Sequence, residues 1–176
     1  MIKIDLGKYI SKATLNPRGG DDRVFTPQAT VLECLTFLNE FKSFQKAVKV
    51  LEPASGEGAF SKELLRVGKD VIECEISNGT NFFEFNDKVD FIVTNPPWSL
   101  TRKFLVHSMS VSDNIAFLIP INHLIGLKAR MRDMKQKGFW VTDVKLITTP
   151  KEFPQSGFQL GFCLIQRTDV LETRFY

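Results

Sequence analysis

Short apolar runs, each bounded by polar or turn-forming residues, recur along the chain. Six of them cover residues 48–54, 71–76, 89–93, 115–119, 141–147 and 162–165. Runs of this length with such flanks are typical of buried β-strands. The hydrophobic pattern therefore predicts six strands, spread over most of the sequence.

Segments with helical spacing of apolar residues lie before and between these runs. Three of them cover residues 27–44, 58–67 and 100–109. A fourth carries its apolar stripe on Leu124, Leu127, Met131 and Met134 and ends at Gly138. Strands that alternate with helices predict an α/β fold, in which a mostly parallel sheet is covered by helices. The loops at the carboxyl ends of the strands are then the expected place for a functional site.

Composition narrows the class of protein. The chain has 176 residues, 43% of them hydrophobic, which suits one domain with a proper core. The longest apolar run, residues 115–119, is too short to span a membrane, and the first ten residues do not resemble a signal peptide. We therefore expect a cytoplasmic protein without a membrane partner. The formal net charge of +3 permits a nucleic-acid partner without requiring one.

The cysteines agree with the expected cytoplasmic location. Cys34, Cys74 and Cys163 are far apart in the sequence, and each lies in an apolar segment. They are expected to be buried thiols, and the sequence has no Cys/His cluster with the spacing of metal ligands. His107 and His123 lie in helical segments without a catalytic partner pattern, so we expect packing or surface roles for both. No metal is predicted.

The most unusual segment is Asn95-Pro96-Pro97-Trp98, directly after the apolar run 89–93. Two consecutive prolines must end the strand in a rigid loop. That loop presents an amide, a main-chain carbonyl and an indole, a set suited to a planar base with an exocyclic amine. The Asn95 oxygen and the Pro96 carbonyl can each accept one amine hydrogen, which favours a pyramidal, nucleophilic nitrogen in the transition state.

A second motif, residues 52–60, follows the first predicted strand and opens a helix. Gly56 and Gly58 let the backbone pass close under a ligand, and the helix N-terminus favours a carboxylate there. A dinucleotide site is the competing interpretation. Such a site requires a third glycine where this chain has Ser61.

The two motifs resemble motifs IV and I of the gamma class of adenine-N6 DNA methyltransferases, which use S-adenosylmethionine. The resemblance implies that Asn95, Pro96, Pro97 and Trp98 are catalytic. It also implies a three-layer Rossmann-like fold in which Glu52 lies near the cofactor's amino group. Weaker matches extend the same motif order from Phe25 to residues 162–165.

These matches imply the rest of the cofactor site. Phe25-Thr26-Pro27 resembles motif X, although Thr26 can equally be a helix N-cap with proline at N1. Glu75 is the expected ribose ligand, with Glu73 as the alternative if the register differs. The implied cofactor-binding residues are Phe25, Thr26, Pro27, Glu52, Pro53, Ala54, Gly56, Gly58, Glu75, Ile76, Asn81, Phe82 and Asn95.

Two departures from the family pattern matter. Only five residues separate Glu75 from Asn81, so the usual helix and third strand have almost no room. The sheet should have about six strands, with that edge strand reduced or lost and the last strand antiparallel. We also expect an arm over residues 1–22 and one methyltransferase domain over residues 23–176, with no separate target-recognition domain.

The resemblance also implies the substrate. The first choice is DNA, with the target adenine flipped out and held between Trp98 and Phe153, or Phe158 as the alternative. Arg102, with Arg18 and Arg23, flanks the expected mouth of the site and could contact phosphates. The basic residues of 128–137 are expected to lie mostly on the solvated face of a helix, with Lys128 and Arg130 nearest the site. An RNA adenine methyltransferase, a protein glutamine methyltransferase and a non-catalytic adenosyl-binding subunit are the alternatives. A second subunit or a homodimer could supply target recognition.

Overall fold

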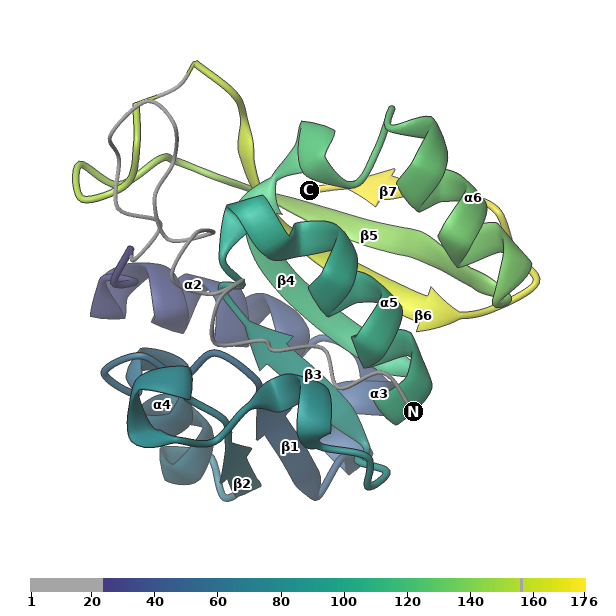
Figure 1. Cartoon of the computed structure of the whole chain (residues 1–176). Helices are drawn as coiled ribbons and strands as arrows, with labels where there is room; N and C mark the ends of the chain where they lie inside the picture. Colours follow the sequence, from purple (N-terminus) through teal and green to yellow (C-terminus); the bar gives the residue numbers. More distant parts are fainter. Residues whose placement is uncertain (1–23, 156) are drawn as a thin grey trace.

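The computed structural model describes residues 24–155 and 157–176. The predicted arm over residues 1–22, with Arg18, lies outside this part, as does Arg23. Within the described residues the sheet has seven strands, in the order β2-β1-β3-β4-β6-β5-β7 (Figure 1). The strands are β1 (Lys49–Glu52), β2 (Asp70–Glu73), β3 (Phe91–Thr94), β4 (Asn114–Pro120), β5 (Phe139–Ile147), β6 (Leu160–Arg167) and β7 (Arg174–Phe175).

Most neighbouring strands are parallel. β1 pairs in parallel with β2 and β3, and β3 pairs in parallel with β4. β6 is antiparallel to both β4 and β5, and the short β7 pairs in parallel with β5. The predicted α/β fold is therefore confirmed, and β6, the last of the six predicted strands, is antiparallel as expected, whereas the additional last strand β7 is parallel to its neighbour.

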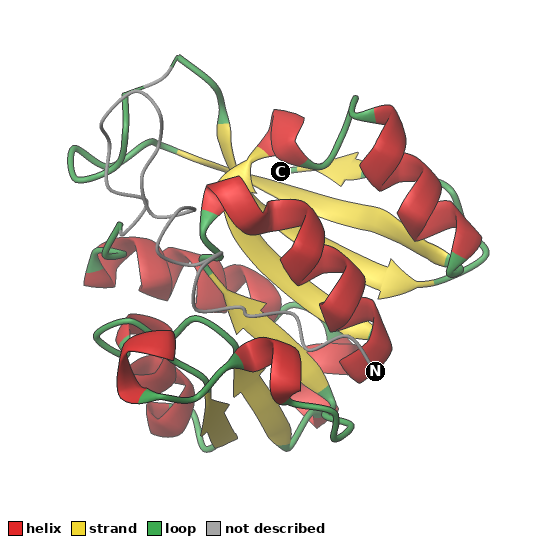
Figure 2. Ribbon diagram, viewed as in Figure 1, coloured by secondary structure: helices red, strands yellow, loops and turns green. Residues whose placement is uncertain are grey.

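Helices cover both faces of this sheet and give the three layers seen in Figure 2. On one face lie α2 (Gln28–Leu38), α3 (Lys42–Lys46) and α4 (Ala59–Arg66), and on the other lie α5 (Thr101–Val111) and α6 (Lys128–Gln136). Short 3-10 helices occupy the loops: η1 (Ile76–Asn78), η2 (Phe82–Glu84), η3 (Trp98–Leu100) and η4 (Ile121–His123).

Two hydrophobic cores separate these layers because successive strand residues point to opposite faces. Val50 of β1 packs in the core under α2 and α4, whereas its neighbour Leu51 packs in the core under α5. Phe91 and Ile92 of β3 divide in the same way, and all four side chains are fully buried. Each such burial stabilises the fold by about 1.5–3 kcal/mol.

The segment between β2 and β3 confirms the predicted loss of an edge strand. It contains η1 and η2, and β2 is the last strand at that edge of the described sheet. The chain turns back after Glu75 because Glu75 caps η1 and Gly79, with a φ of 83°, ends it. The loop is therefore free to line the site instead of forming a strand.

Helix boundaries differ from the sequence prediction in two places. The single helix predicted over residues 27–44 is two helices, α2 and α3, because the backbone of Phe41 is extended and its ring packs edge-on against Phe37 at 5.0 Å. Leu65 of the predicted helix 58–67 and Leu127 of the predicted apolar stripe are 59% and 43% exposed. β7 was not predicted at all.

Candidate functional site

The site lies at the carboxyl ends of β1, β2 and β3, where the three following loops meet the segment that precedes α2. Two adjoining cavities occupy this place, of about 380 and 510 Å³. Both volumes are in the range of about 300–1,000 Å³ that is usual for small-molecule sites. Residues that line both cavities are Val24, Phe25, Ala54, Gly56, Glu57 and Asn95. Asn95 therefore lies at the junction of the two cavities.

Glu52 supplies a carboxyl group to the smaller cavity. It ends β1, is 2% exposed and accepts a hydrogen bond of 3.0 Å from the Ser61 hydroxyl. Burial raises the pKa of Glu52 well above its usual value, and the hydrogen bond from Ser61 offsets this only in part. Ser61 lies in the first turn of α4, where the sequence showed only the absence of a third glycine. A buried acid of this kind suits a cationic ligand group, which would restore its charge.

The loop between β1 and α4 needs its two glycines. Gly56 has a φ of 52° and Gly58 a φ of 76°, in the left-handed region that favours glycine. A Cβ atom on Gly56 would lie 3.7 Å from the Phe25 ring, so the two segments approach closely. The loop can therefore pass under a ligand that lies against Phe25, which is 53% exposed.

Glu75 is oriented toward the larger cavity by its neighbours. Its Oε2 accepts from the Gly56 amide at 2.9 Å, and its Oε1 accepts from the Ser77 amide and hydroxyl at 3.0 and 2.8 Å. Glu73, the alternative ligand, is exposed and does not line either cavity; its Oε1 would lie 3.5 Å from a Cβ atom on Gly58. Of the two glutamates, only Glu75 is placed to reach a ligand there.

The far wall of the larger cavity is apolar. Ile76, Phe82, Phe83 and Phe104 line it, and Phe82 packs on Phe104 with ring centroids 5.2 Å apart. The Asn81 oxygen accepts from the Phe83 amide at 3.0 Å and thereby caps η2. An apolar wall with a fixed polar group beside it is suited to a flat heteroaromatic ring.

Asn95 is held by both of its amide atoms. Its Nδ2 donates to the Val24 carbonyl and to the Thr26 hydroxyl, each at 3.2 Å. Its Oδ1 accepts from the Trp98 indole nitrogen at 3.3 Å. Helix α2 begins at Gln28 with Pro27 as its cap residue, so the prediction of Thr26 as N-cap was wrong. The Thr26 hydroxyl instead accepts a hydrogen bond from Asn95.

The predicted aromatic clamp is not preformed. Trp98 and Phe153 are in contact, with ring centroids 5.8 Å apart and planes tilted by 38°, and Phe153 is 2% exposed in the core. A base between two rings needs about 7 Å, twice the contact distance between carbon atoms. A base can enter only if one ring moves. Phe158, the alternative, is 54% exposed and lines a separate hollow of about 550 Å³ beside Leu146.

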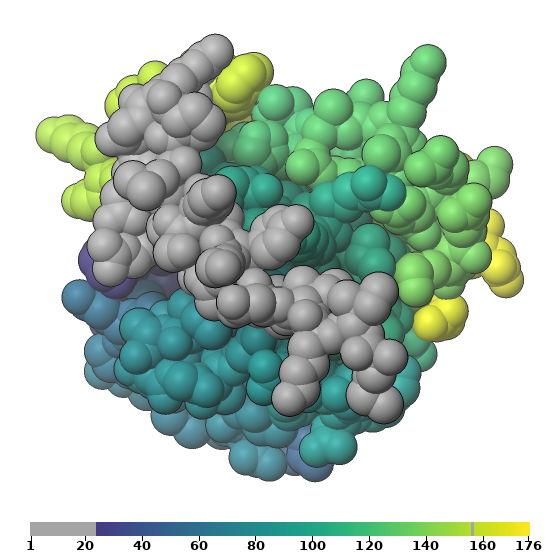
Figure 3. Space-filling model, in the orientation of Figure 1, coloured from purple at the N-terminus to yellow at the C-terminus, as the bar shows by residue number. Residues whose placement is uncertain are grey.

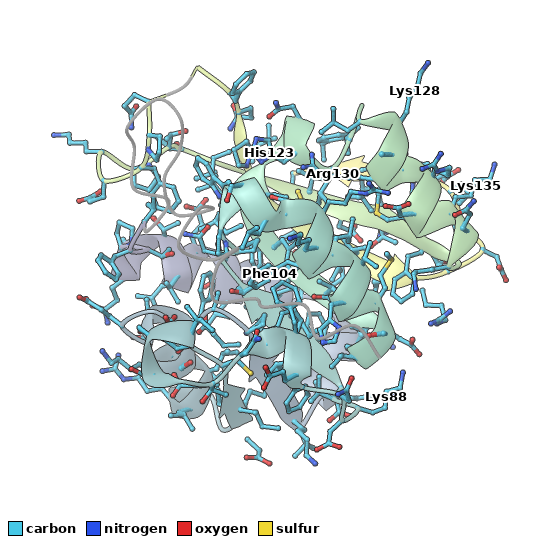
Figure 4. All side chains as sticks on the ribbon, viewed as in Figure 1. Lys88, Phe104, His123, Lys128, Arg130 and Lys135 are labelled. Atoms are coloured by element: carbon cyan, nitrogen blue, oxygen red, sulfur yellow. The ribbon has the colours of Figure 1, made fainter. Side chains whose placement is uncertain are left out.

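Basic side chains of α5 and α6 differ in their environment. Arg102 is exposed and forms two hydrogen bonds of 2.7 and 3.2 Å with Asp133, which tie α5 to α6. Arg130 is half-buried, and its Nε has no partner among the described residues. Burial, and then the charge of Arg102, lower the pKa of Arg130. Lys128 and Lys135 extend away from the body of the molecule, as expected for a solvated face (Figure 4).

Both histidines lie near the site. The His107 Nε2 is 2.8 Å from the Phe85 carbonyl oxygen, and its ring packs edge-on against Phe82 at 4.6 Å. His123, in η4, lies 6.1 Å from Trp98 between ring centroids. The sequence did not predict that either histidine lies beside the site, because both contacts join segments that are distant in the chain.

Most predicted cofactor residues come together. Among them, Pro27 and Gly58 do not line either cavity. Pro96, Pro97 and Trp98 line the larger cavity, whereas Phe153 and Arg102 lie outside both. Sequence reasoning missed Val24, which acts through its main chain and so leaves no side-chain signal. It also missed Phe104, which belongs to the apolar face of the predicted helix 100–109.

The cysteines, possible metal ligands and helix lengths bear on the class of protein. The thiols of Cys34, Cys74 and Cys163 are free and buried, as predicted. Within residues 24–155 and 157–176, no three His, Cys, Asp or Glu side chains cluster as metal ligands would. Over the same part of the chain, no helix has the length and apolar character needed to cross a membrane.

No family model matches the sequence, and no curated protein matches it. Solved structures do match the fold. A candidate RNA methyltransferase from Pyrococcus horikoshii is 18% identical, with a TM-score of 0.67 over 84% of this chain and 86% of that one. A candidate class I S-adenosylmethionine-dependent methyltransferase from Listeria monocytogenes is 16% identical, with a TM-score of 0.62 over 96% and 71%.

A modification subunit of a candidate type I restriction enzyme from Vibrio vulnificus is 16% identical, with a TM-score of 0.63. It matches 97% of this chain, which spans only 50% of that subunit. Likenesses at this identity concern the fold, and the strand order and layers described above agree with them. The chain therefore has the Rossmann-like fold of S-adenosylmethionine-dependent methyltransferases.

Proposed function

We propose that this protein transfers a methyl group from S-adenosylmethionine to the N6 amine of adenine in DNA. One observation carries the proposal: Asn95 lies at the junction of two cavities, and Pro96, Pro97 and Trp98 follow it along the wall of the larger one. A residue at such a junction can face a cofactor that extends through both cavities, and the loop that follows it offers the wall against which an acceptor base would lie.

The lining residues fit S-adenosylmethionine. The buried Glu52 carboxyl group would receive the ammonium of the methionine end, with the glycine loop beneath it. Glu75 would accept ribose hydroxyls, and Ile76, Asn81 and Phe82 would surround the adenine ring. When bound, the cofactor supplies a methyl group on a sulfonium, which is an electrophile that needs no metal.

The acceptor loop fits an exocyclic amine. The Asn95 oxygen and the Pro96 carbonyl are both acceptors, and the hydrogens of a neutral amine are donors. Hydrogen bonds to both hydrogens draw the nitrogen lone pair out of conjugation with the ring. Stabilisation of that pyramidal nitrogen is specific to the transition state, so it raises the rate of transfer and not merely substrate binding.

Trp98 offers the face on which the target base would stack. A paired adenine cannot reach this loop, so the base must be flipped out or taken from a single strand. Phe153 remains our proposed second stacking partner, and its contact with Trp98 would have to open on binding. A flipped base that separates these two rings would recover part of the lost contact through stacking.

DNA is the first choice of polymer because the Asn-Pro-Pro-Trp loop resembles that of adenine-N6 DNA methyltransferases, and because fold neighbours include modification subunits of type I restriction enzymes. Recognition in such an arrangement could come from a second subunit or a second copy. RNA is the second candidate, since the fold also matches 86% of a candidate RNA methyltransferase.

Two assays test the proposal. S-adenosylmethionine and its demethylated product should raise the melting temperature, because they bind the native state alone, whereas NAD should not. Incubation with methyl-labelled cofactor and separate DNA, RNA and protein pools should label adenine in DNA. Equal stabilisation by NAD would contradict the cofactor assignment, and label confined to RNA or protein would contradict the choice of DNA.

A further inference from the structure

We propose that Thr26, together with the Val24 carbonyl, is a positioning residue that holds the Asn95 amide with its oxygen toward the target amine. The inference rests on the proposed function, because it concerns the acceptor of that amine. It assigns to the segment before α2 a role beyond lining the cofactor cavity.

An asparagine side chain has two faces that differ only in which atom is oxygen and which is nitrogen. The torsion that exchanges them is broad and roughly two-fold, so an unrestrained amide samples both orientations. With its nitrogen toward the target, Asn95 would oppose one N–H donor with another. Only the orientation with oxygen toward the target can accept an amine hydrogen.

The neighbours of Asn95 select that orientation. The Val24 carbonyl can only accept, so the amide atom 3.2 Å from it must be the nitrogen. The Trp98 indole can only donate, so the atom 3.3 Å from it must be the oxygen. The Thr26 hydroxyl accepts the second hydrogen of Nδ2 at 3.2 Å and completes its pairing.

The oxygen keeps capacity for the substrate. A carbonyl-type oxygen has two acceptor sites, and the Trp98 indole takes one of them at the long distance of 3.3 Å. Among the described residues, the second is left for an amine hydrogen of the target. The nitrogen, in contrast, has both of its hydrogens paired with residues 24 and 26, so rotation of the amide would break two hydrogen bonds at once.

Thr26 also lines the smaller cavity, so a simpler role as cofactor ligand must be separated from the positioning role. The two roles predict different kinetics. Loss of a cofactor contact raises the Kd for S-adenosylmethionine and leaves kcat at saturation unchanged. Loss of the positioning contact lowers kcat at saturating cofactor and leaves that Kd nearly unchanged.

The test compares Thr26→Val and Thr26→Ser in the full chain. Thr26→Val keeps the shape and removes the hydroxyl, and kcat should fall about 3- to 10-fold, the worth of one hydrogen bond. Thr26→Ser should restore kcat. Thr142→Val is the matched control, because Thr142 in β5 donates to Gln166 at 3.1 Å away from the cavities. An unchanged kcat in Thr26→Val, or a change confined to the Kd, would overturn the inference.

A spectroscopic measurement keeps the inference testable if the wild-type protein methylates no adenine, which would contradict the proposed function instead. In protein with ¹⁵N-labelled tryptophan, the two indole signals can be assigned with Trp140→Phe. Thr26→Val should shift the Trp98 signal, because the Asn95 oxygen that it contacts is no longer held, while Thr142→Val should not. An unmoved Trp98 signal in Thr26→Val would overturn the positioning role.

Discussion

At the scale of single residues, Glu52 is a side chain whose acid–base chemistry is strongly altered by the fold. Its carboxyl group is almost completely buried, and burial raises its pKa well above the usual value of 4.5. Burial of a neutral carboxylic acid costs little free energy, whereas burial of an ionised carboxylate requires a partner. In the absence of a cationic ligand, this residue therefore opposes folding as the pH rises.

The sign of this effect can be tested with Glu52→Gln. Between the unfolded pKa, near 4.5, and the raised folded pKa, the folded protein binds more protons, so its free energy of unfolding falls as pH increases. Glutamine keeps an acceptor for Ser61 and does not titrate. The variant should therefore be the more stable protein at neutral pH and should lose this slope, while it binds S-adenosylmethionine more weakly.

Urea denaturation from pH 5 to 8 without ligand measures the slope, with Glu33→Gln, exposed on α2, as the control. Parallel stability curves for the wild type and Glu52→Gln would show that Glu52 is ionised in the folded protein. They would remove the basis for its proposed pairing with an ammonium group.

Most of the candidate residues that the sequence named line the two cavities, but their hydrogen-bond partners could not be predicted. Asn95, Glu52 and Glu75 could be named as candidates because each lies at the end of a strand or within two residues of it, and because the motifs include them. The contact of Asn95 with Val24 joins residues 71 positions apart and involves a main-chain oxygen, so no local pattern indicates it. Ser61 was noticed only as a missing glycine, although its hydroxyl supports Glu52.

At the scale of secondary-structure elements, the position of η4 depends on a glycine in β6. A Cβ atom on Gly161 would lie 2.6 Å from Ile121 Cγ1 and 3.2 Å from a methyl of Val144. The Ile121 amide also donates to the Gln159 carbonyl at 3.0 Å. η4 therefore sits directly on β6, and this contact places His123 beside Trp98.

Gly161→Ala should destabilise the protein by about 1–3 kcal/mol, the usual cost of overpacking, and should displace η4. Ile121→Ala removes the two nearest atoms that the new methyl would meet, while the Val144 methyl at 3.2 Å remains. The double variant should therefore be more stable than the sum of the two single effects, a coupling that thermal or urea unfolding can measure. Additive effects of the two substitutions would contradict this account of the η4 contact.

The six principal strands and the loss of an edge strand could be predicted, because buried runs and short spacings are local signals. The break between α2 and α3 could not, since it depends on the packing of Phe41 against Phe37. β7 was also not predicted. Its pairing relies on Asp143, which accepts from Arg174 at 2.8 Å and from the Tyr176 hydroxyl at 3.1 Å.

At the scale of the whole molecule, the net charge is weakly basic, at +3. The arginines of α5 and α6 differ in whether an acidic side chain neutralises them. Asp133 pairs with Arg102, whereas the Nε of Arg130 has no hydrogen-bond partner among the described residues, and the charge of Arg102 lowers the pKa of Arg130. In the space-filling view, α6 (green) lies at the upper right of the face that α5 also covers (Figure 3). We therefore expect Arg130 to contact a nucleic-acid phosphate.

Arg130→Gln should weaken binding to duplex DNA at every sequence and reduce the slope of log affinity against log salt by about 0.9, the share of one phosphate contact. Fluorescence anisotropy of a labelled duplex over a salt series measures both quantities. Lys135→Gln is the matched control, because Lys135 extends away from the body of the molecule (Figure 4). Equal slopes for Arg130→Gln and the wild type would exclude this contact.

The central claim is that Asn95 accepts the amine of a flipped adenine beside bound S-adenosylmethionine. The most direct measurement is the yield of N6-methyladenine, by mass spectrometry of nucleosides from adenine-containing DNA, for the wild type and Asn95→Ala. The account predicts methylated adenine with the wild type and a loss of about 10²-fold or more in the variant, with cofactor binding retained. Near-normal transfer by Asn95→Ala would contradict it.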